Sequence, residues 1–389
     1  MRRRGTSRTI ALLTGAATVV AACGLSGAGP ALADVPQPDC GKIYQRKGSG
    51  FYEDNPVYVD RRNDSAEWKV STPKAEGLDG KRIRAGVAYL ARTSSLTSVI
   101  VMRHGKLVTE SYFHGGAVNR ARNIHSSSKG VIQALVGIAV SERRIGSLND
   151  PISKYLPATY FTGPGADKRN ITVRHLLTMS SGIAWKEDKS ERLIEKQPDW
   201  VRAILARPLA HRPGTTFTYG SDNTHLLSAI LQRATGMNTC RYAETRLFSK
   251  INITPEHWGR DPQGVYSGGY NLYLTPREMA KFGQLYLNGG RWNGRQVVPR
   301  VTVRQAATTV LKADRTYSYS SGWWKQRIRG VDIFFGWGFG GQFLYVIPSL
   351  DVVFATTQDT SPGADGQEVD EVTFVRDYLL PAVQKRKGA

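Results

Sequence analysis

The sequence has few cysteines, histidines and acidic residues, and it has no long apolar run beyond its first 33 residues. Only 3 cysteines and 7 histidines occur among 389 residues, without a Cys-x-x-Cys or a His-x-x-x-His pair, so the spacing predicts no metal site. The chain also lacks a P-loop and the Gly-x-Ser-x-Gly elbow of α/β-hydrolases. Beyond residue 33, no segment is apolar for long enough to predict a stable membrane span.

The first 33 residues have the pattern of an export signal. Arginines at positions 2–4 precede an apolar, small-residue stretch at 10–25, and Ala31-Leu32-Ala33 has the small-x-small pattern of a signal-peptidase site. We therefore expect residues 1–33 to be a signal peptide and the protein to be secreted. The alternative is a lipoprotein, because residues 20–23 resemble a lipobox that would anchor the chain through Cys23.

The charge is strongly positive, with 53 basic and 32 acidic residues and a formal net charge of +21. The basic residues are dispersed and form no tract interleaved with aromatics, so we expect no nucleic-acid partner. Two explanations stay open, a generally basic solvated surface or an anionic cell-wall polymer as partner. In an oxidising compartment Cys40 and Cys240 either form a bridge or remain two unpaired thiols.

The chain divides into an irregular extension at residues 34–75 and one domain at residues 76–386. Paired apolar stretches near both ends of this domain predict β-hairpins, whereas apolar residues recur at helical spacing over about 121–290. We therefore expect an α+β fold. Residues of about 76–120 and 315–386 would form one antiparallel sheet flanked by helices, with a mostly helical region inserted.

Several helix boundaries are also predicted. Thr275 opens a capping box with proline at the first helical position, and Ser221 or Asp222 can cap a helix that Gly236 ends. Residues 368–383 are expected to form a closing amphipathic helix.

One stretch combines a possible nucleophile with a possible base. Ser126 lies three residues before Lys129, and residues 131–140 are almost wholly apolar, which predicts a helix buried on all sides. Residues three apart share a helix face, so the hydroxyl and the amine can meet. Burial and the positive end of the helix dipole both lower the pKa of a lysine amine, which could then take the serine proton.

Three further stretches, together with Ser126-x-x-Lys129, resemble the serine beta-lactamase and penicillin-recognising family. The similar segments are residues 174–182, with His-Leu-Leu-x-Met-x-Ser-Gly, residues 282–290, and the Tyr-x-Ser element at Tyr219. The branch most similar to this chain is that of the class C-like esterases and 6-aminohexanoate-dimer hydrolases. The resemblance covers about residues 77–382 and implies the beta-lactamase/transpeptidase-like fold.

The resemblance also implies roles for individual residues. Ser126, Lys129 and Tyr219 would be catalytic, with the Tyr219 hydroxyl moving a proton between nucleophile and leaving group, its phenolate favoured by a nearby ammonium. Ser221 would bind substrate in the same element. Substrate would also meet a strand through Trp337, Gly338 and Phe339, and the N–H groups of Ser126 and Phe339 would form the oxyanion hole.

The sequence departs from the lactamase pattern where Gly336 replaces the strand lysine that faces a substrate carboxylate. It also has Trp185, and no tyrosine, just after the Ser-Gly segment, where some nylon-oligomer hydrolases carry one. We therefore expect an exported serine hydrolase that cleaves an ester or amide of a small molecule, without cofactor. The alternatives are a D-Ala peptidase or weak beta-lactamase, and a non-catalytic cell-wall binding module.

Overall fold

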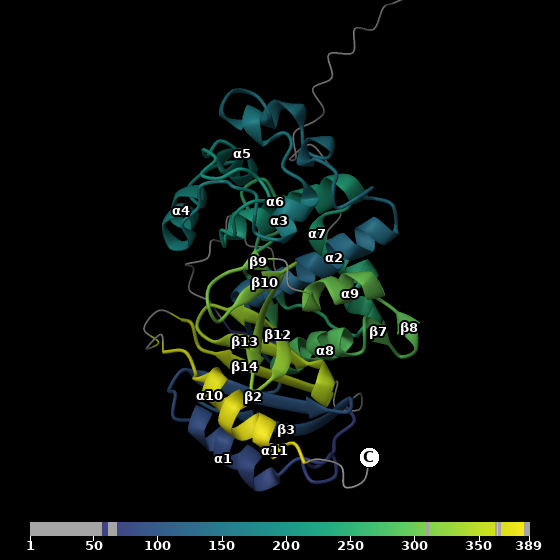
Figure 1. Ribbon diagram of the computed structural model, residues 1–389, viewed down its shortest axis with the longest axis vertical. Helices are drawn as coiled ribbons and strands as arrows, with labels where there is room; N and C mark the ends of the chain where they lie inside the picture. The colour runs from purple at the N-terminus through teal and green to yellow at the C-terminus, as the bar shows by residue number, and fades with distance from the viewer. Residues whose placement is uncertain (1–56, 61–67, 309–310, 362–363, 365–366, 385–389) are drawn as a thin grey trace, which may run out of the picture.

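The computed structural model describes residues 57–60, 68–308, 311–361, 364 and 367–384. The expected signal peptide and most of the extension at residues 34–75 lie outside these ranges, as do Cys23 and Cys40. Within them, a large sheet with covering helices forms one half of the molecule and a helical region forms the other (Figure 1).

Eight strands form the large sheet, and each neighbouring pair is antiparallel. The hairpin from the start of the domain joins the hairpin from its end through the pairing of β2 with β14. This arrangement confirms the expected α+β fold with a sheet built from both ends. In spatial order the strands are β3 (Lys106–Tyr112), β2 (Leu96–Arg103), β14 (Val352–Gln358), β13 (Gln342–Ile347), β12 (Val331–Gly338), β11 (Trp323–Ile328), β10 (Ser318–Ser320) and β9 (Leu311–Lys312).

Both faces of this sheet are covered. Alternate side chains of a strand point to opposite faces, and accordingly Val101 of β2 belongs to one apolar core whereas Ile100 belongs to the other. Helix α1 (Gly80–Leu90) and the C-terminal helical segments cover one face, while α2 (Lys129–Ser141) and α8 (Pro276–Leu287) lie on the other (Figure 1). β2 and β14 are buried along their whole length, which explains their continuous apolar sequences.

Helix α2 is buried on nearly every side, as its sequence predicts. It contacts α6 (Ser221–Thr235), α7 (Thr239–Arg246) and α9 (Arg300–Ala307). A Cβ atom on Gly137 would lie 2.2 Å from the Thr302 hydroxyl oxygen. A 3₁₀ turn, His125–Ser128, comes directly before it. Ser126 therefore lies in this tighter turn and not in the first turn of the α-helix.

The inserted region is mostly helical, as expected. The Thr275 capping box is present at the start of α8, with the Thr275 hydroxyl accepting from the backbone of Glu278 and the Glu278 side chain accepting from the backbone of Thr275. The remaining helices of this region are α3 (Val173–Leu177), α4 (Glu187–Ile194), α5 (Trp200–Leu205), α6 (Ser221–Thr235) and α7 (Thr239–Arg246).

The start of α6 differs from the prediction. Gly236 ends the helix in the left-handed conformation, at φ 70°, as predicted, but the N-cap residue is Gly220. Neither Ser221 nor Asp222 caps the helix, because both are already helical residues. The Ser221 hydroxyl is therefore available for contacts with other side chains.

Short strands outside the large sheet were not apparent from the sequence, because two to four residues carry no readable period. β1 (Tyr58–Val59), β4 (Arg120–Asn123), β6 (Leu272–Leu274) and β5 (His257–Trp258) form a second sheet, and β7 (Arg291–Trp292) pairs with β8 (Arg295–Gln296). The closing helix starts later than expected and comprises α10 (Glu371–Thr373), a π-helical turn (Phe374–Leu379) and α11 (Leu380–Ala382). Among the described residues, no helix has the length and apolarity needed to cross a membrane.

Candidate active site

The Lys129 amine lies next to the Ser126 hydroxyl at the start of α2. The two side chains are 2.9 Å apart, between Nζ and Oγ, and Lys129 is only 1% exposed whereas Ser126 is half-buried. Burial lowers the pKa of Lys129 from its usual value of 10.5, against the opposing effects of Glu187, Glu191 and Asp222. The amine is thus placed and tuned to take the serine proton, while the hydroxyl stays within reach of a substrate.

The Lys129 amine faces three oxygen atoms. Nζ donates to Ser126 Oγ at 2.9 Å, to Ser221 Oγ at 3.0 Å and to the carbonyl oxygen of Gly269 at 3.2 Å. A neutral amine has two N–H groups and one lone pair. An amine that keeps its two N–H groups on Ser221 and Gly269 can turn its lone pair toward the Ser126 hydroxyl. Gly269 was not identified from the sequence, since a backbone carbonyl leaves no residue-type signal.

Ser221 connects this amine to a carboxylate. The Ser221 hydroxyl donates to Glu187 Oε1 at 2.6 Å, and the Ser221 N–H donates to Glu187 Oε2 at 3.2 Å. The indole N–H of Trp185 donates to Glu187 Oε2 at 2.5 Å, which places Trp185 beside the site. Glu187 was also missed from the sequence, although it lies only five residues after the Ser181-Gly182 pair that the family resemblance singled out.

Two further acidic side chains, Asp222 and Glu191, act electrostatically on the Lys129 amine. Burial raises the pKa of Asp222 to about 7, and the Glu187 charge adds to the increase. Burial, again with a contribution from Glu187, raises the pKa of Glu191 well above its usual value. Both shifts favour the neutral carboxyl form, which weakens the tendency of these two acids to stabilise the Lys129 ammonium.

Tyr219 contacts both members of the pair. Lys129 Nζ lies over the Tyr219 ring, 5.0 Å from its centroid. Burial raises the pKa of Tyr219 well above its usual value, although hydrogen bonding with Ser126 and Trp324 opposes the increase. The expectation that a nearby ammonium favours the phenolate is therefore wrong. Burial favours the neutral phenol of Tyr219, which can donate a proton.

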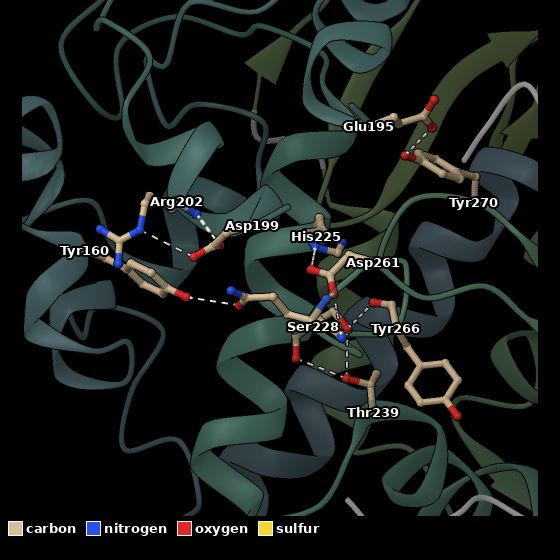
Figure 2. A network of polar contacts seen from close by, with 12 residues as sticks. Tyr160, Glu195, Asp199, Arg202, His225, Ser228, Thr239, Asp261, Tyr266 and Tyr270 are labelled. Atoms are coloured by element: carbon tan, nitrogen blue, oxygen red, sulfur yellow. Dashed lines mark hydrogen bonds and ion pairs between the residues drawn. The ribbon is translucent and has the colours of Figure 1, made fainter. Parts of the chain in front are cut away.

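A network of polar contacts holds α6 against the loop that supplies Gly269 (Figure 2). His225 Nε2 lies 3.1 Å from Asp261 Oδ2, and the Ser228 hydroxyl donates to the carbonyl oxygen of Tyr266 at 2.6 Å. Tyr270, next to Gly269, donates from its hydroxyl to Glu195 at 2.9 Å. Ser221 and Gly269, both of them acceptors of the Lys129 amine, therefore belong to elements that are fixed to each other.

The nucleophile turn has its own support. Asn123 Oδ1 accepts from the N–H of His125 at 2.9 Å and from the N–H of Asn271 at 3.0 Å. His125 has φ 45°, an uncommon conformation for a residue with a side chain, and it is completely buried. Burial lowers the pKa of His125 to about 3, so its imidazole, which contacts Thr360, is neutral.

Strand β12 lies directly against this turn. Cβ atoms on Gly336 and Gly338 would lie 3.0 Å from Ser127 Oγ and 2.3 Å from the carbonyl oxygen of Ile124, respectively. Ser127 donates to the carbonyl oxygen of Gln342 at 2.6 Å, which ties the turn to the neighbouring strand β13. Only glycine allows β12 to approach so closely. Trp337 therefore points to the opposite face of the strand.

Among the described residues, the end of β12 pairs with a strand on one edge only. Residues 336–338 pair with β13, whereas the register between β12 and β11 ends at Phe335 and Trp324. Phe339 follows at the end of this segment, 51% exposed, with its ring 5.5 Å from that of His125. This end of β12 and Phe339 thus lie beside the turn that holds Ser126.

The remaining predictions concern cysteines and metals. Cys240, in α7, is disulfide-bonded, whereas Cys40 lies outside the described residues. Within the described part of the chain, no cluster of three or more histidine, cysteine or acidic side chains could hold a metal ion.

The fold and the arrangement of Ser126, Lys129 and Tyr219 define a protein of the penicillin-recognising class. A model of the beta-lactamase family, described as Beta-lactamase, matches residues 76–375, and the chain belongs to this family.

Individual relatives share a low sequence identity with this chain. The chain is 26% identical over 293 residues to the 6-aminohexanoate-dimer hydrolase of Paenarthrobacter ureafaciens, covering 65% of this chain and 70% of that protein. It is 27% identical over 168 residues to Protein flp of Staphylococcus aureus (strain MRSA252), covering 40% of this chain and 33% of flp. A solved Bacillus anthracis structure, provisionally named a 6-aminohexanoate-dimer hydrolase, has a TM-score of 0.67 at 20% identity, covering 85% and 90% of the two chains, and shows the same fold.

Proposed function

We propose that the protein is an exported serine hydrolase that cleaves an ester or amide through a covalent acyl-enzyme on Ser126. One observation carries this proposal: a buried lysine amine lies 2.9 Å from a half-buried serine hydroxyl and has two further acceptors, Ser221 and the Gly269 carbonyl, for its N–H groups. The name of the Paenarthrobacter relative, a 6-aminohexanoate-dimer hydrolase, supports hydrolysis as the reaction.

The geometry supports the following sequence of steps. Lys129 takes the proton of Ser126, and Oγ forms a bond to the substrate carbonyl carbon. The N–H groups of Ser126 and Phe339 stabilise the oxyanion. The bond to the leaving alcohol or amine then breaks, and the leaving atom takes a proton from Tyr219, whose phenol regains one from Lys129. Water attacks the acyl-enzyme by the same route and releases the acid, which restores Ser126.

The residues at the end of β12 support a substrate that is uncharged where it meets this strand. Gly336 lies where a side chain could otherwise reach the site, and a Cβ atom there already lies 3.0 Å from Ser127 Oγ. No cation is therefore supplied from this position to pair with a substrate carboxylate. Ser221, the other proposed binding residue, has its hydroxyl engaged by Lys129 and Glu187, so we assign it to positioning the amine.

The location and partner of the enzyme belong to the same proposal. We propose secretion from the pattern of residues 1–33, with attachment through Cys23 as the alternative. An anionic cell-wall polymer is the partner that the net charge of +21 favours. Neither proposal depends on the catalytic cluster.

The test is p-nitrophenyl butyrate hydrolysis followed from the first turnover. Ser126→Ala should lower kcat by about 10⁴-fold or more, and a burst with the native enzyme would show that deacylation is slow. Ser128→Ala is the matched control, because its buried hydroxyl makes no hydrogen bond in the described part of the chain. Full activity in Ser126→Ala would disprove the mechanism.

If neither the native protein nor Ser126→Ala hydrolyses the ester, labelling with fluorescent penicillin distinguishes the two alternative functions. Labelling that requires Ser126 would indicate a D-Ala peptidase or weak beta-lactamase. The absence of labelling, together with binding to cell walls, would indicate a non-catalytic module.

A further inference from the structure

A continuous group of aromatic side chains extends from Tyr219 along the end of the sheet. The Tyr219 ring lies 5.2 Å from that of Trp324, and Trp324 lies 5.7 Å from Trp337 and 6.2 Å from Tyr317. Phe217 joins the group at 6.0 Å from Trp324. We call these five residues, Phe217, Tyr219, Tyr317, Trp324 and Trp337, the aromatic wall. They come from the chain before α6, from the residue before β10 and from strands β11 and β12.

The rings of the aromatic wall pack against buried rings and remain partly exposed to solvent. All five side chains are half-buried, in contrast to the completely buried rings that they touch. Tyr319, 1% exposed, lies 5.2 Å from Trp324, and Phe343, also 1% exposed, lies 5.9 Å from Trp337. Rings that pack against buried neighbours and keep part of their surface exposed offer a rigid apolar surface at little cost in side-chain entropy.

The wall begins at the atoms that would carry out the reaction. Tyr219 is hydrogen-bonded to both Ser126 and Trp324, so the Trp324 indole reaches the phenol that donates the proton. Trp337 lies two residues before Phe339, the proposed oxyanion donor, on the segment of β12 that pairs on one edge only among the described residues. A group attached to the leaving atom therefore meets Trp324 first. A ring on that group reaches Trp337 next, because Trp337 packs against Trp324 on the face of β12 that is turned away from the nucleophile turn.

The wall also disfavours charge. Its ionisable members are tyrosines whose pKa burial raises, so their hydroxyls stay neutral. Glu368 contacts Trp337, and burial raises its pKa while hydrogen bonds from Trp337 and from the backbone of Gly340 oppose the increase. A flat uncharged ring fits such a surface better than a saturated group of equal size, because aromatic pairs gain from stacked or edge-to-face geometry.

We propose that the aromatic wall is the leaving-group subsite and that the preferred substrates release an alcohol or amine bearing an aromatic ring one carbon atom away from the scissile heteroatom. This inference rests on the proposed hydrolase function and specifies its substrate class. Trp337 and Trp324 determine the preference by contact with the ring, while Ser126 and Lys129 perform the chemistry.

The experiment compares benzyl acetate with cyclohexylmethyl acetate, which share an acyl group and release alcohols with a flat and a puckered six-membered ring, respectively. With rates normalised to alkaline hydrolysis, kcat/KM of the native enzyme should favour benzyl acetate by about 3-fold to 10-fold, the size of one or two ring contacts. Trp337→Leu should bring this ratio close to one. Trp292→Leu, which changes a half-buried indole of the distant β7–β8 hairpin, should keep the native ratio.

A Trp324→Phe variant keeps a ring at the wall and should retain part of the preference even where Trp337→Leu folds poorly. The proposal is overturned if the native ratio is near one, or if it survives in Trp337→Leu. It is also overturned if the preference appears only with phenylacetyl esters of ethanol, which would place the ring on the acyl side. If both esters are hydrolysed at equal normalised rates and hydrolysis requires Ser126, the proposed hydrolase function stands and only the leaving-group subsite is rejected.

Discussion

The Ser221 hydroxyl donates a 2.6 Å hydrogen bond to Glu187 and accepts one of 3.0 Å from the Lys129 amine. One hydroxyl thus separates the proposed base from a carboxylate that favours its protonated, inactive form. Burial lowers the pKa of Lys129 and the Glu187 charge raises it, so in the proposed mechanism the balance between these two effects would set the pH at which the amine becomes a base.

Replacing Glu187 with glutamine should shift the pH profile. Lys129 acts as a base only when neutral, so kcat/KM rises with pH through the Lys129 pKa and then levels off. The amide keeps an oxygen that can accept from Ser221 but removes the charge, so the pKa falls further. The acidic limb of the profile should therefore move to lower pH by about one unit. The measurement is kcat/KM for p-nitrophenyl butyrate against pH.

Asp188→Asn is the matched control for this variant, because it neutralises the neighbouring, exposed acid of α4. Its profile should coincide with that of the native enzyme. If the acidic limb of the Glu187→Gln pH profile stays at the native pH or moves to higher pH, Glu187 does not act on the Lys129 amine.

Replacing Tyr219 with phenylalanine should affect poor leaving groups most. Burial favours the protonated phenol, so its proposed role is to donate a proton to the departing atom. An alkoxide needs that proton, whereas p-nitrophenolate leaves readily as an anion. We expect kcat/KM for ethyl butyrate to fall by about 10²-fold to 10⁴-fold and that for p-nitrophenyl butyrate to fall much less. Equal losses for both esters would assign Tyr219 to positioning alone.

Alanine at Gly338 and at Gly336 should have unequal effects on stability. A Cβ atom on Gly338 would lie 2.3 Å from a backbone carbonyl, at Ile124, so β12 and the nucleophile turn must separate. We expect a loss of about 1–3 kcal/mol in the free energy of unfolding and a lower kcat. At Gly336 the nearest atom is Ser127 Oγ at 3.0 Å, which can yield, so the loss should be smaller. Urea denaturation measures both, and equal losses would contradict this account of the contact.

Much of the fold could be predicted because its signals are local and repeated. The hairpin strands have long apolar sequences, α2 is apolar around its whole circumference, and the Thr275 capping box marks the start of α8. The cap of α6 was mispredicted because Ser221 matches the residue preference of a cap, but its hydroxyl bonds to Glu187 and the helix begins one residue earlier. The short strands β4 and β6 depend on each other and leave no pattern in either segment alone.

By itself, the sequence determined which residues could perform the chemistry, because Ser126-x-x-Lys129 at the head of an apolar helix joins a hydroxyl and an amine through local geometry alone. Only the tertiary structure decided their chemical states. Two acceptors of the amine, Ser221 and the Gly269 carbonyl, lie 92 and 140 residues further along the chain. A pKa depends on burial and on charges brought close by folding, which is why the sequence alone led to a phenolate at Tyr219, whereas burial in the folded chain favours a neutral phenol there.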